Sequence, residues 1–295
     1  MLWMGENLVT LPQFYTVQDL RAQVATWHAQ GLKVALTPTM GALHAGHLSL
    51  VEEGFRRADR VIATIFVNPT QFGPGEDFDR YPRQEQADAD LLASASCSGL
   101  YRPSVAEMYA PGFCTSITVA GLSQDLCGVF RPTHFSGVAT VVTKLLLQAL
   151  PDVALFGEKD YQQLTVIRRT VKDLDIPVEI IGVPTLREAD GLALSSRNRY
   201  LTSAERAIAP LMFQTLTEAG HAFASGQNAQ NVCATATAKL LTGGFSAVDY
   251  VAIRDAETLE SIEQWAGKPG RILGAAKLGA ARLIDNIPIL GRNSG

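Results

Sequence analysis

Cysteine is scarce in this sequence, and its pattern excludes several kinds of site. The 295 residues include four cysteines, at Cys97, Cys114, Cys127 and Cys233. No two of them form a C-x-x-C pair and no histidine stands at zinc-ligand spacing, so neither a metal-thiolate site nor a disulfide framework is expected. Unpaired thiols fit a reducing compartment, and we therefore expect a cytoplasmic protein.

An excess of positive charge is also missing. The chain has 25 lysines and arginines against 29 aspartates and glutamates, which gives a formal net charge of −4. A polyanion needs a broad basic surface, so nucleic acid is not expected as the main partner. A small anion needs only a local group of donors, and small anionic ligands are therefore not excluded.

Long apolar runs are absent as well. No run approaches the roughly 20 residues with which a helix crosses a bilayer, so no membrane span is expected. The start of the chain lacks the basic segment and the apolar core of a signal peptide. We expect the first dozen residues to form a loose arm, and either Met1 or Met4 is the true start.

The chain does contain enough apolar material for a large core. Hydrophobic residues make up 47% and charged residues 18% of the sequence, which is a globular composition. Apolar segments of strand length alternate with amphipathic helices, and the clearest of these segments are 34–36, 61–67, 153–156 and 178–183. This alternation predicts an α/β fold, with a Rossmann-like parallel sheet that carries helices on both faces.

The pattern changes after Pro184, which closes the last of these segments. We therefore predict a first domain over 1–184 and a smaller C-terminal α+β domain over 185–295. In the second domain we expect helices over 204–225 and 232–241 and strands over 248–253, 271–276 and 281–287. In the first, shorter strands are expected over 100–103 and 117–119 and a helix from about 138 to 149.

The most informative stretch follows the first apolar segment, where residues 37–47 read TPTMGALHAGH. His44 and His47 lie three residues apart, so on a first helical turn both rings share one face and can reach one bound group. A helix that starts after a parallel strand attracts anions, and Gly46 leaves space for a flat ligand against the backbone. A lone histidine here would favour a capping or packing role. Two on one face indicate a phosphate or nucleotide site.

Other segments bring polar side chains to the same edge of the sheet. Gln71 follows the second apolar segment, and Lys159 follows the third, where a cation can reach a phosphate. Taken alone, Lys159 would be an ordinary surface cation. Residues 76–80 are charged and flanked by glycine and proline, so we expect a mobile loop that can cover a site.

A loop rich in hydrogen-bond donors follows the expected domain boundary. It contains Ser195, Ser196 and Arg197. Small hydroxyls donate without crowding and a guanidinium binds oxyanions bidentately, so this set can clamp a polyphosphate. The alternative is an ordinary serine-rich linker.

Together these motifs resemble the pantothenate synthetase family of the HxGH nucleotidyltransferase superfamily, which also includes class I aminoacyl-tRNA synthetases. The matching segments follow one another along nearly the whole chain: 38–47, 67–72, 131–135, 156–163, 190–198 and 282–286. The family condenses (R)-pantoate with β-alanine at the expense of ATP and releases AMP and pyrophosphate through a pantoyl-adenylate. The departures are minor, with Leu194 where many members have Met and Ala280-Ala281 where Lys-Thr is common.

The resemblance also implies roles for individual residues. ATP would be contacted by Met40, Gly41, Ala42, Leu43, His44, Ala45, Gly46, His47, Gly157, Glu158, Lys159, Asp160, Leu186, Leu194, Ser195, Ser196 and Arg197. The catalytic groups among them would be His44, Lys159, Ser195, Ser196, Arg197 and His47, the usual proton donor. Gln71 and Gln163 would hold pantoate, and Gln71 would also meet β-alanine.

The metal, the assembly and the domain roles come from the same resemblance. ATP would act with Mg²⁺, and Asp88 corresponds to a family acid near that ion, although helix surfaces carry such acids routinely. The first domain would bind ATP and pantoate, and the second would close over the site. The expected assembly is a homodimer.

The sequence leaves two other functions open. An adenylyltransferase of the same superfamily would need extra cations for a phosphorylated acceptor, whereas two glutamines occupy the acceptor side here. A nucleotide-binding sensor without turnover would need no paired histidines beside the phosphates.

Overall fold

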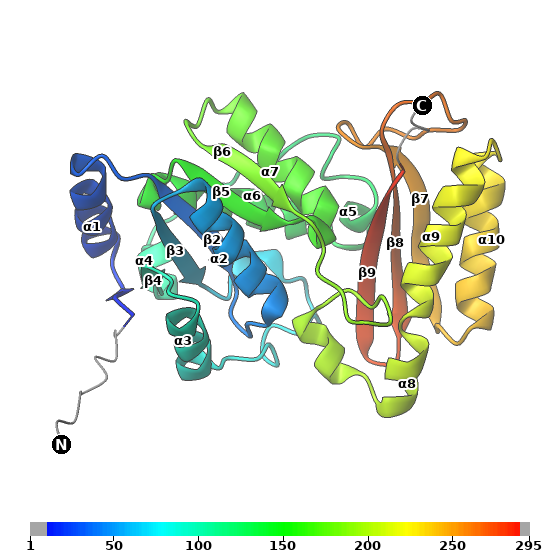
Figure 1. Cartoon of the computed structure of the whole chain (residues 1–295), viewed down its shortest axis with the longest axis horizontal. Helices are drawn as coiled ribbons and strands as arrows, with labels where there is room; N and C mark the ends of the chain where they lie inside the picture. Colours follow the sequence, from blue (N-terminus) through cyan, green and yellow to red (C-terminus); the bar gives the residue numbers. More distant parts are fainter. Residues whose placement is uncertain (1–10, 290–295) are drawn as a thin grey trace, which may run out of the picture.

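The computed structural model describes residues 11–289, so Met4 and nearly all of the expected N-terminal arm lie outside it. Its larger sheet has six strands in the order β1-β4-β3-β2-β5-β6 (Figure 1). All neighbouring strands pair in parallel, which confirms the predicted sheet. The strands are β1 (Gln13–Phe14), β2 (Val34–Thr39), β3 (Arg60–Ile65), β4 (Gly99–Tyr101), β5 (Val153–Gly157) and β6 (Glu179–Val183).

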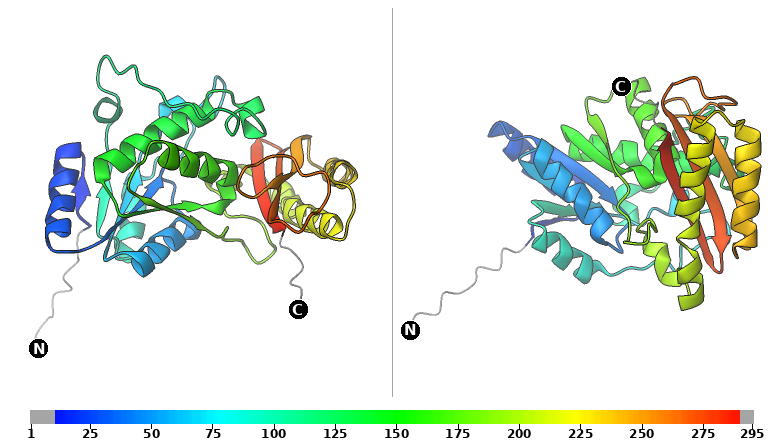
Figure 2. Two further views of the ribbon diagram at one scale, coloured as in Figure 1. Left: turned by 90° about the horizontal axis from the view of Figure 1, so that it is seen from above. Right: turned by 45° about the vertical axis from the view of Figure 1, so that its right-hand side comes forward.

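Helices cover both faces of this sheet, as the view from above shows (Figure 2). Successive strand residues point to opposite faces, so Leu36 of β2 packs into one apolar cluster and Ala35 into the other. The first cluster receives α1 (Val17–Ala29), α6 (His134–Ala149) and α7 (Tyr161–Asp173), and the second receives α2 (Ala45–Arg57) and α3 (Glu85–Ser94). No helix within residues 11–289 has the length and apolar character needed to cross a membrane.

The chain reverses its direction across the sheet at β2, and this reversal positions the site. From β2 the chain runs outward to β3 and β4, and it later returns to β5 on the other side of β2. The connections therefore diverge above the carboxyl ends of β2 and β5, where open α/β sheets bind their ligands. The loops at these two ends carry His44 and Lys159.

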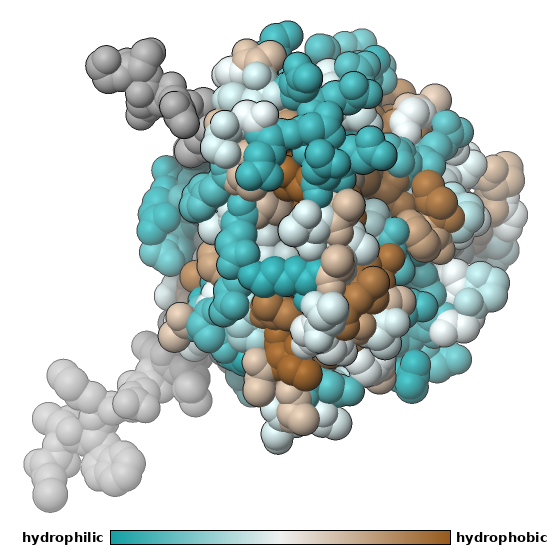
Figure 3. Space-filling model, turned by 90° about the vertical axis from the view of Figure 1, so that its right-hand side faces the viewer, coloured by the Kyte–Doolittle hydropathy of each residue, from teal (hydrophilic) through white to brown (hydrophobic). Residues whose placement is uncertain are grey.

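A second, antiparallel sheet follows, with the order β7-β8-β9. Its strands are β7 (Ala247–Asp255), β8 (Gly270–Leu278) and β9 (Ala281–Ile289). The helices α9 (Leu211–Ala224) and α10 (Ala229–Thr242) pack on one face, around Leu216, Phe223 and Ile272. Seen from this end, the surface is a mixture of polar residues and separate apolar groups (Figure 3). The other face turns toward the parallel sheet, whose last strand ends at Val183; a domain boundary at 184 stays a prediction.

The remaining helical elements are short and lie in the connections. They are η1 (Pro69–Gln71), α4 (Val105–Met108), α5 (Cys127–Phe130), η2 (Glu158–Asp160), η3 (Ser196–Tyr200) and α8 (Ser203–Ile208). Three of them, η1, η2 and η3, lie in segments that carry residues of the expected site.

Three local predictions were wrong. The helix expected over 204–225 is divided into α8 and α9, because Pro210 has no N–H to continue the helical hydrogen bonds. Residues 117–119 form no strand, because the Ile117 N–H donates to Thr140 Oγ1 on α6, at 2.9 Å, instead of to a strand. Helix α6 begins at His134, one turn earlier than expected.

Candidate active site

The two histidines form the N-terminal cap of α2. The backbone N–H of Gly46 donates to His44 Nδ1 at 3.1 Å, and the N–H of His44 donates to His47 Nδ1 at 3.3 Å. The ring centroids are 4.1 Å apart. Because both Nδ1 atoms accept hydrogen bonds, each neutral ring carries its proton on Nε2. The capping role is thus compatible with the expected ligand-facing role, since capping leaves two Nε2–H donors beside the cavity that the rings line.

Gly46 is required by this cap. A Cβ atom at this position would lie 2.9 Å from Cε1 of His44 and 3.7 Å from Cβ of Leu194. The space that the sequence suggested for a ligand is thus shared with the imidazole of His44. A side chain at residue 46 would displace the ring before it met any ligand.

Both histidines are neutral at pH 7. Burial, and then the positive charges of Lys159 and Arg199, lower the pKa of His44 to about 4. Burial, followed by the neighbouring His44, lowers the pKa of His47 to about 3. The pair can therefore offer N–H donors to a ligand but not full positive charges. Lys159, whose charge acts on both rings and which lines the same cavity, can supply such a charge.

Asp88 holds the loop that precedes the histidines. Its side chain is buried, and its two oxygens accept the N–H groups of Ala42 and Leu43, each at 2.8 Å. These bonds stabilise a turn in which Gly41 and Ala42 have φ values of +82° and +53°. At Gly41 a Cβ would also lie 2.9 Å from Asp88 Oδ2, so glycine is needed there.

The expected contact between Asp88 and Mg²⁺ stays a prediction. Both carboxylate oxygens are already engaged by the loop. Across residues 11–289, no three histidine, cysteine, aspartate or glutamate side chains are arranged to hold a metal ion. What the geometry supports is a positioning role for Asp88 under the histidine loop.

A cavity of about 230 Å³ lies above the carboxyl ends of β2 and β5. It brings together most residues expected to contact ATP or pantoate: Met40, His44, Gly46, His47, Gln71, Gly157, Lys159, Asp160, Gln163, Leu186, Leu194, Ser195, Ser196 and Arg197. The expected contacts that do not line it are Gly41, Ala42, Leu43, Ala45 and Glu158. Ala42 and Leu43 are buried parts of the loop itself, and Glu158 turns its carboxylate to Arg271.

Gln71 is fixed in place by its neighbours. Asn68 Nδ2 donates to Gln71 Oε1 at 3.0 Å, and Gln71 Nε2 contacts Met40 Sδ at 3.1 Å. The Gln71 carbonyl is also held by Nδ1 of His134, at 2.9 Å. The amide therefore lies in the cavity in one orientation, close to the loop that carries the histidines.

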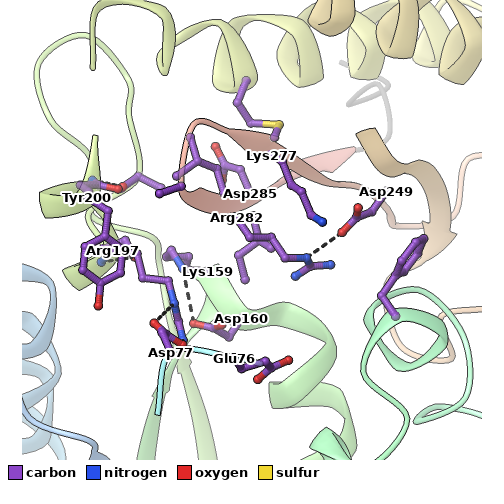
Figure 4. Close-up of a pocket in the computed structure, with 18 of the residues that line it drawn as sticks. Glu76, Asp77, Lys159, Asp160, Arg197, Tyr200, Asp249, Lys277, Arg282 and Asp285 are labelled. Carbon is purple, nitrogen blue, oxygen red and sulfur yellow. Dashed lines mark hydrogen bonds and ion pairs between the residues drawn. The ribbon is translucent and has the colours of Figure 1, made fainter. Parts of the chain in front are cut away.

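A second cavity, of about 580 Å³, adjoins the first and extends to the antiparallel sheet (Figure 4). Residues that line both cavities form their common wall: Arg131, Lys159, Asp160, Ser195 and Arg197. The cations assigned to the phosphates, Lys159 and Arg197, therefore lie between the two cavities. They are not at the closed end of either cavity.

The loop over residues 76–80 lies along this wall. Asp77 accepts Nε and Nη2 of Arg197 at 3.0 and 2.9 Å, and Glu76 pairs with Arg131 at 2.6 Å. Burial would raise the pKa of each carboxyl, but the paired guanidinium outweighs burial and lowers it. The sequence suggested a covering loop here but gave no sign of these two ion pairs.

The antiparallel sheet supports the loop of Lys159. Asn286 Nδ2 donates to the carbonyls of Glu158 and Lys159 at 2.8 and 3.0 Å. Arg271 pairs with Glu158 at 3.0 Å and stacks on the ring of Tyr161, 3.7 Å from its centroid. Asn286 lies in one of the segments that carry the family resemblance, but the sequence assigned it no role. These contacts fix the backbone from which Lys159 reaches the cavity.

Two comparisons of sequence agree with this geometry. A family model described as pantoate-beta-alanine ligase matches residues 13–288. A pantothenate synthetase from Paramagnetospirillum magneticum is 61% identical over 274 residues, which cover 93% of this chain and 96% of that protein. One from Rhodospirillum rubrum is 55% identical, over 95% of this chain and 99% of that protein.

Solved structures are similar over nearly the whole chain. The crystal structure of a pantothenate synthetase from Thermus thermophilus has a TM-score of 0.87 at 45% identity, and the match covers 95% of this chain and 100% of that one. A pantoate-beta-alanine ligase from Francisella tularensis, in complex with beta-gamma ATP and beta-alanine, has a TM-score of 0.79 at 35% identity. That match covers 94% of this chain and 97% of the other.

Proposed function

The chain belongs to the pantoate-beta-alanine ligase family, and from this premise we propose that it condenses (R)-pantoate with β-alanine, using ATP and a pantoyl-adenylate intermediate. The observation that carries the proposal is the 230 Å³ cavity, in which the paired histidines, Lys159 and the Ser195–Arg197 segment lie beside Gln71 and Gln163. Donors for a polyphosphate thus meet neutral amides suited to a hydroxy acid.

In the first step the pantoate carboxylate attacks the α-phosphorus of ATP. The bond from this phosphorus to the bridging oxygen breaks, and pyrophosphate leaves with the electron pair. A carboxylate is already a nucleophile at pH 7, so this step needs positioning and charge stabilisation more than a strong base. The Nε2–H groups of His44 and His47, with Lys159 and Arg197, are placed to stabilise the charge on the phosphates.

In the second step the β-alanine amine attacks the acyl carbon, the bond to AMP breaks, and the amine loses a proton. Water must be kept out between the steps, because an acyl-adenylate hydrolyses. We propose that Mg²⁺ enters as part of the substrate MgATP and is held mainly by phosphate and water oxygens. Neutral glutamines suit pantoate, since they bind its hydroxyls without a tight ion pair.

Exchange of labelled pyrophosphate into ATP tests this proposal. We expect exchange that requires pantoate and Mg²⁺ but not β-alanine, because the adenylate forms before the amine attacks. Exchange that appeared only with β-alanine would contradict this order, and ADP as the product would exclude an adenylate. No exchange or turnover with any combination of the substrates would favour the sensor, and an AMP group retained on the acceptor would favour the adenylyltransferase.

The two glutamines carry a separate prediction. Gln71→Ala and Gln163→Ala should raise the KM for pantoate at least about tenfold and leave the KM for ATP within about twofold, because each amide is assigned to the acceptor. Steady-state kinetics with each substrate varied in turn measures both values. Gln162→Ala is not a suitable control, since Gln162 is buried and bonds the carbonyls of Leu122 and Asp125. Equal changes in both KM values would count against the assignment.

We also propose a homodimer in the cytoplasm, which is the state that the family resemblance implies. Sedimentation equilibrium of the purified chain would then give twice the mass of 31.7 kDa. A monomer at micromolar concentration would contradict the proposal.

A further inference from the structure

The positions of the two adjoining cavities indicate the direction in which the leaving group moves in the first chemical step. Displacement at phosphorus places the attacking and leaving oxygens roughly in line, on opposite sides of the phosphorus. Of the two cavities, Gln71 and Gln163, which are assigned to pantoate, line the smaller one and not the larger. With the α-phosphate at the histidines, the leaving pyrophosphate must therefore move away from this cavity, toward Lys159 and the larger one.

The far wall of the larger cavity presents two cations on neighbouring strands. Lys277 of β8 and Arg282 of β9 are directly opposite each other in the antiparallel register. Both line the cavity, and Figure 4 shows both side chains ending on the side where Asp249 lies, with Arg282 Nε donating to that carboxylate. Like charges directly opposite across a strand pair are destabilising. An anion bound between them would offset this repulsion.

The described acidic side chains offset only part of the positive charge of Lys277 and Arg282. Asp249 pairs with Arg282 through Nε, at 2.7 Å, and is itself largely buried. Lys277 is exposed to the cavity, and no acidic side chain among residues 11–289 lies within ion-pair distance of it. Lys277 therefore has no acidic partner within residues 11–289.

The other charged residues that line the larger cavity also leave an excess of positive charge. Every acid that lines the cavity is already paired with a cation: Glu76 with Arg131, Asp77 with Arg197, Asp160 with Lys159, Asp249 with Arg282 and Asp285 with Arg187. Among the lining cations that the structure describes, Lys277 and Arg80 remain without an acidic partner. The cavity thus has donors available for an anion at the end distant from the histidines.

We propose that Lys277, with Arg282 beside it, forms a second anion subsite that receives the pyrophosphate released in the first step. The inference rests on the proposed function, because it assigns the larger cavity to the leaving group of that reaction. A lysine is a compact point charge on a flexible stem, which suits an anion in transit. The first phosphate contacts come from Lys159 and Arg197, and Lys277 takes over the anion farther along. No covalent step beyond the displacement itself is involved.

The inhibition constant of pyrophosphate as a product inhibitor tests whether this subsite binds the anion. In Lys277→Gln we expect the inhibition constant of pyrophosphate to rise about tenfold, as the loss of one charge-assisted contact predicts. The inhibition constant of AMP should stay within about twofold, since AMP has no β- or γ-phosphate. Lys277→Arg keeps the charge, so we expect its inhibition constants for pyrophosphate and for AMP to stay near those of the parent enzyme.

Lys172→Gln is the matched control, because Lys172 is an exposed lysine on α7 that does not line the cavity. It should leave both inhibition constants unchanged. Equal pyrophosphate inhibition in Lys277→Gln and in the control would overturn the subsite, and so would a parallel rise in the AMP constant. Failure of the proposed function would look different, since the parent enzyme would then show no pantoate-dependent exchange. Thermal melting of each variant checks that the fold is retained.

Discussion

Replacing either His44 or His47 by alanine is expected to slow adenylate formation by about a hundredfold to a thousandfold, the usual loss for one preorganised donor at developing charge. Each ring presents an Nε2–H group to the cavity that Lys159 also lines. Charge on the phosphates grows as the carboxylate attacks, so this interaction strengthens mainly in the transition state. Single-turnover formation of pantoyl-adenylate measures the effect.

ATP binding should change much less in the same variants. We expect its Kd to stay within about tenfold, or about 1.4 kcal/mol. Chemically made pantoyl-adenylate should restore much of the β-alanine step, because the blocked half-reaction is bypassed. If a variant adenylates pantoate normally but fails with the supplied intermediate, that histidine serves the amine step and its assignment to the phosphates is wrong.

His44→Asn separates the chemical role of His44 from its capping role. Asparagine can accept the Gly46 N–H as the histidine does, so α2 keeps its cap, which is worth about 1 kcal/mol. The shorter side chain does not carry a donor to the position of Nε2. We expect His44→Asn to melt near the parent temperature and to adenylate as slowly as His44→Ala. An active His44→Asn enzyme would show that the cap alone is required.

The charge state of the two rings can be observed directly. With pKa values of about 4 and about 3, both stay neutral as the pH falls through the ordinary histidine value near 6.5. Protonation, with loss of the Nδ1 acceptors, follows only below about pH 4. NMR titration of the imidazole signals in the free enzyme should therefore show no inflection between pH 8 and 5. An inflection near 6.5 in either ring would contradict the neutral-donor assignment.

Asp88→Asn is expected to lower both stability and activity. An amide can accept only one of the two N–H groups that the carboxylate accepts, and its own NH₂ would face the other donor. Leaving a buried donor unsatisfied costs about 1–3 kcal/mol, so urea unfolding should show a loss of this size. The left-handed turn at Gly41 and Ala42 then loses its support, and we expect kcat to fall at least tenfold.

Asp90→Asn is the matched control, on the same helix but exposed. Surface changes of this kind usually stay within about 0.5 kcal/mol. If raising the Mg²⁺ concentration restores the activity of Asp88→Asn, the carboxylate contacts the metal and the positioning role is wrong. Activity that stays low at all Mg²⁺ concentrations, together with reduced stability, supports the positioning role.

Much of the fold could be predicted because its determinants are local. The apolar runs at 61–67 and 153–156, each followed by a breaker and an amphipathic helix, indicated the parallel sheet and the ends at which ligands bind. One error arose where a contact from elsewhere in the chain decided the outcome. Residues 117–119 have the composition of a strand, but the backbone N–H of Ile117 donates to Thr140 Oγ1 of α6.

The sequence by itself determined the order of strands and helices, the HxGH cap and the strand ends that carry Gln71 and Lys159. These features follow from hydrophobic period and turn chemistry, which act over a few neighbouring residues. Only the tertiary structure decided which groups support them. Asp88 holds a loop 46 positions away, Asp77 pairs with an arginine 120 positions away, and Asn286 supports a carbonyl 128 positions away. No local pattern encodes such pairs, because they form only once the folded chain has brought distant segments together and removed these charges and amides from water.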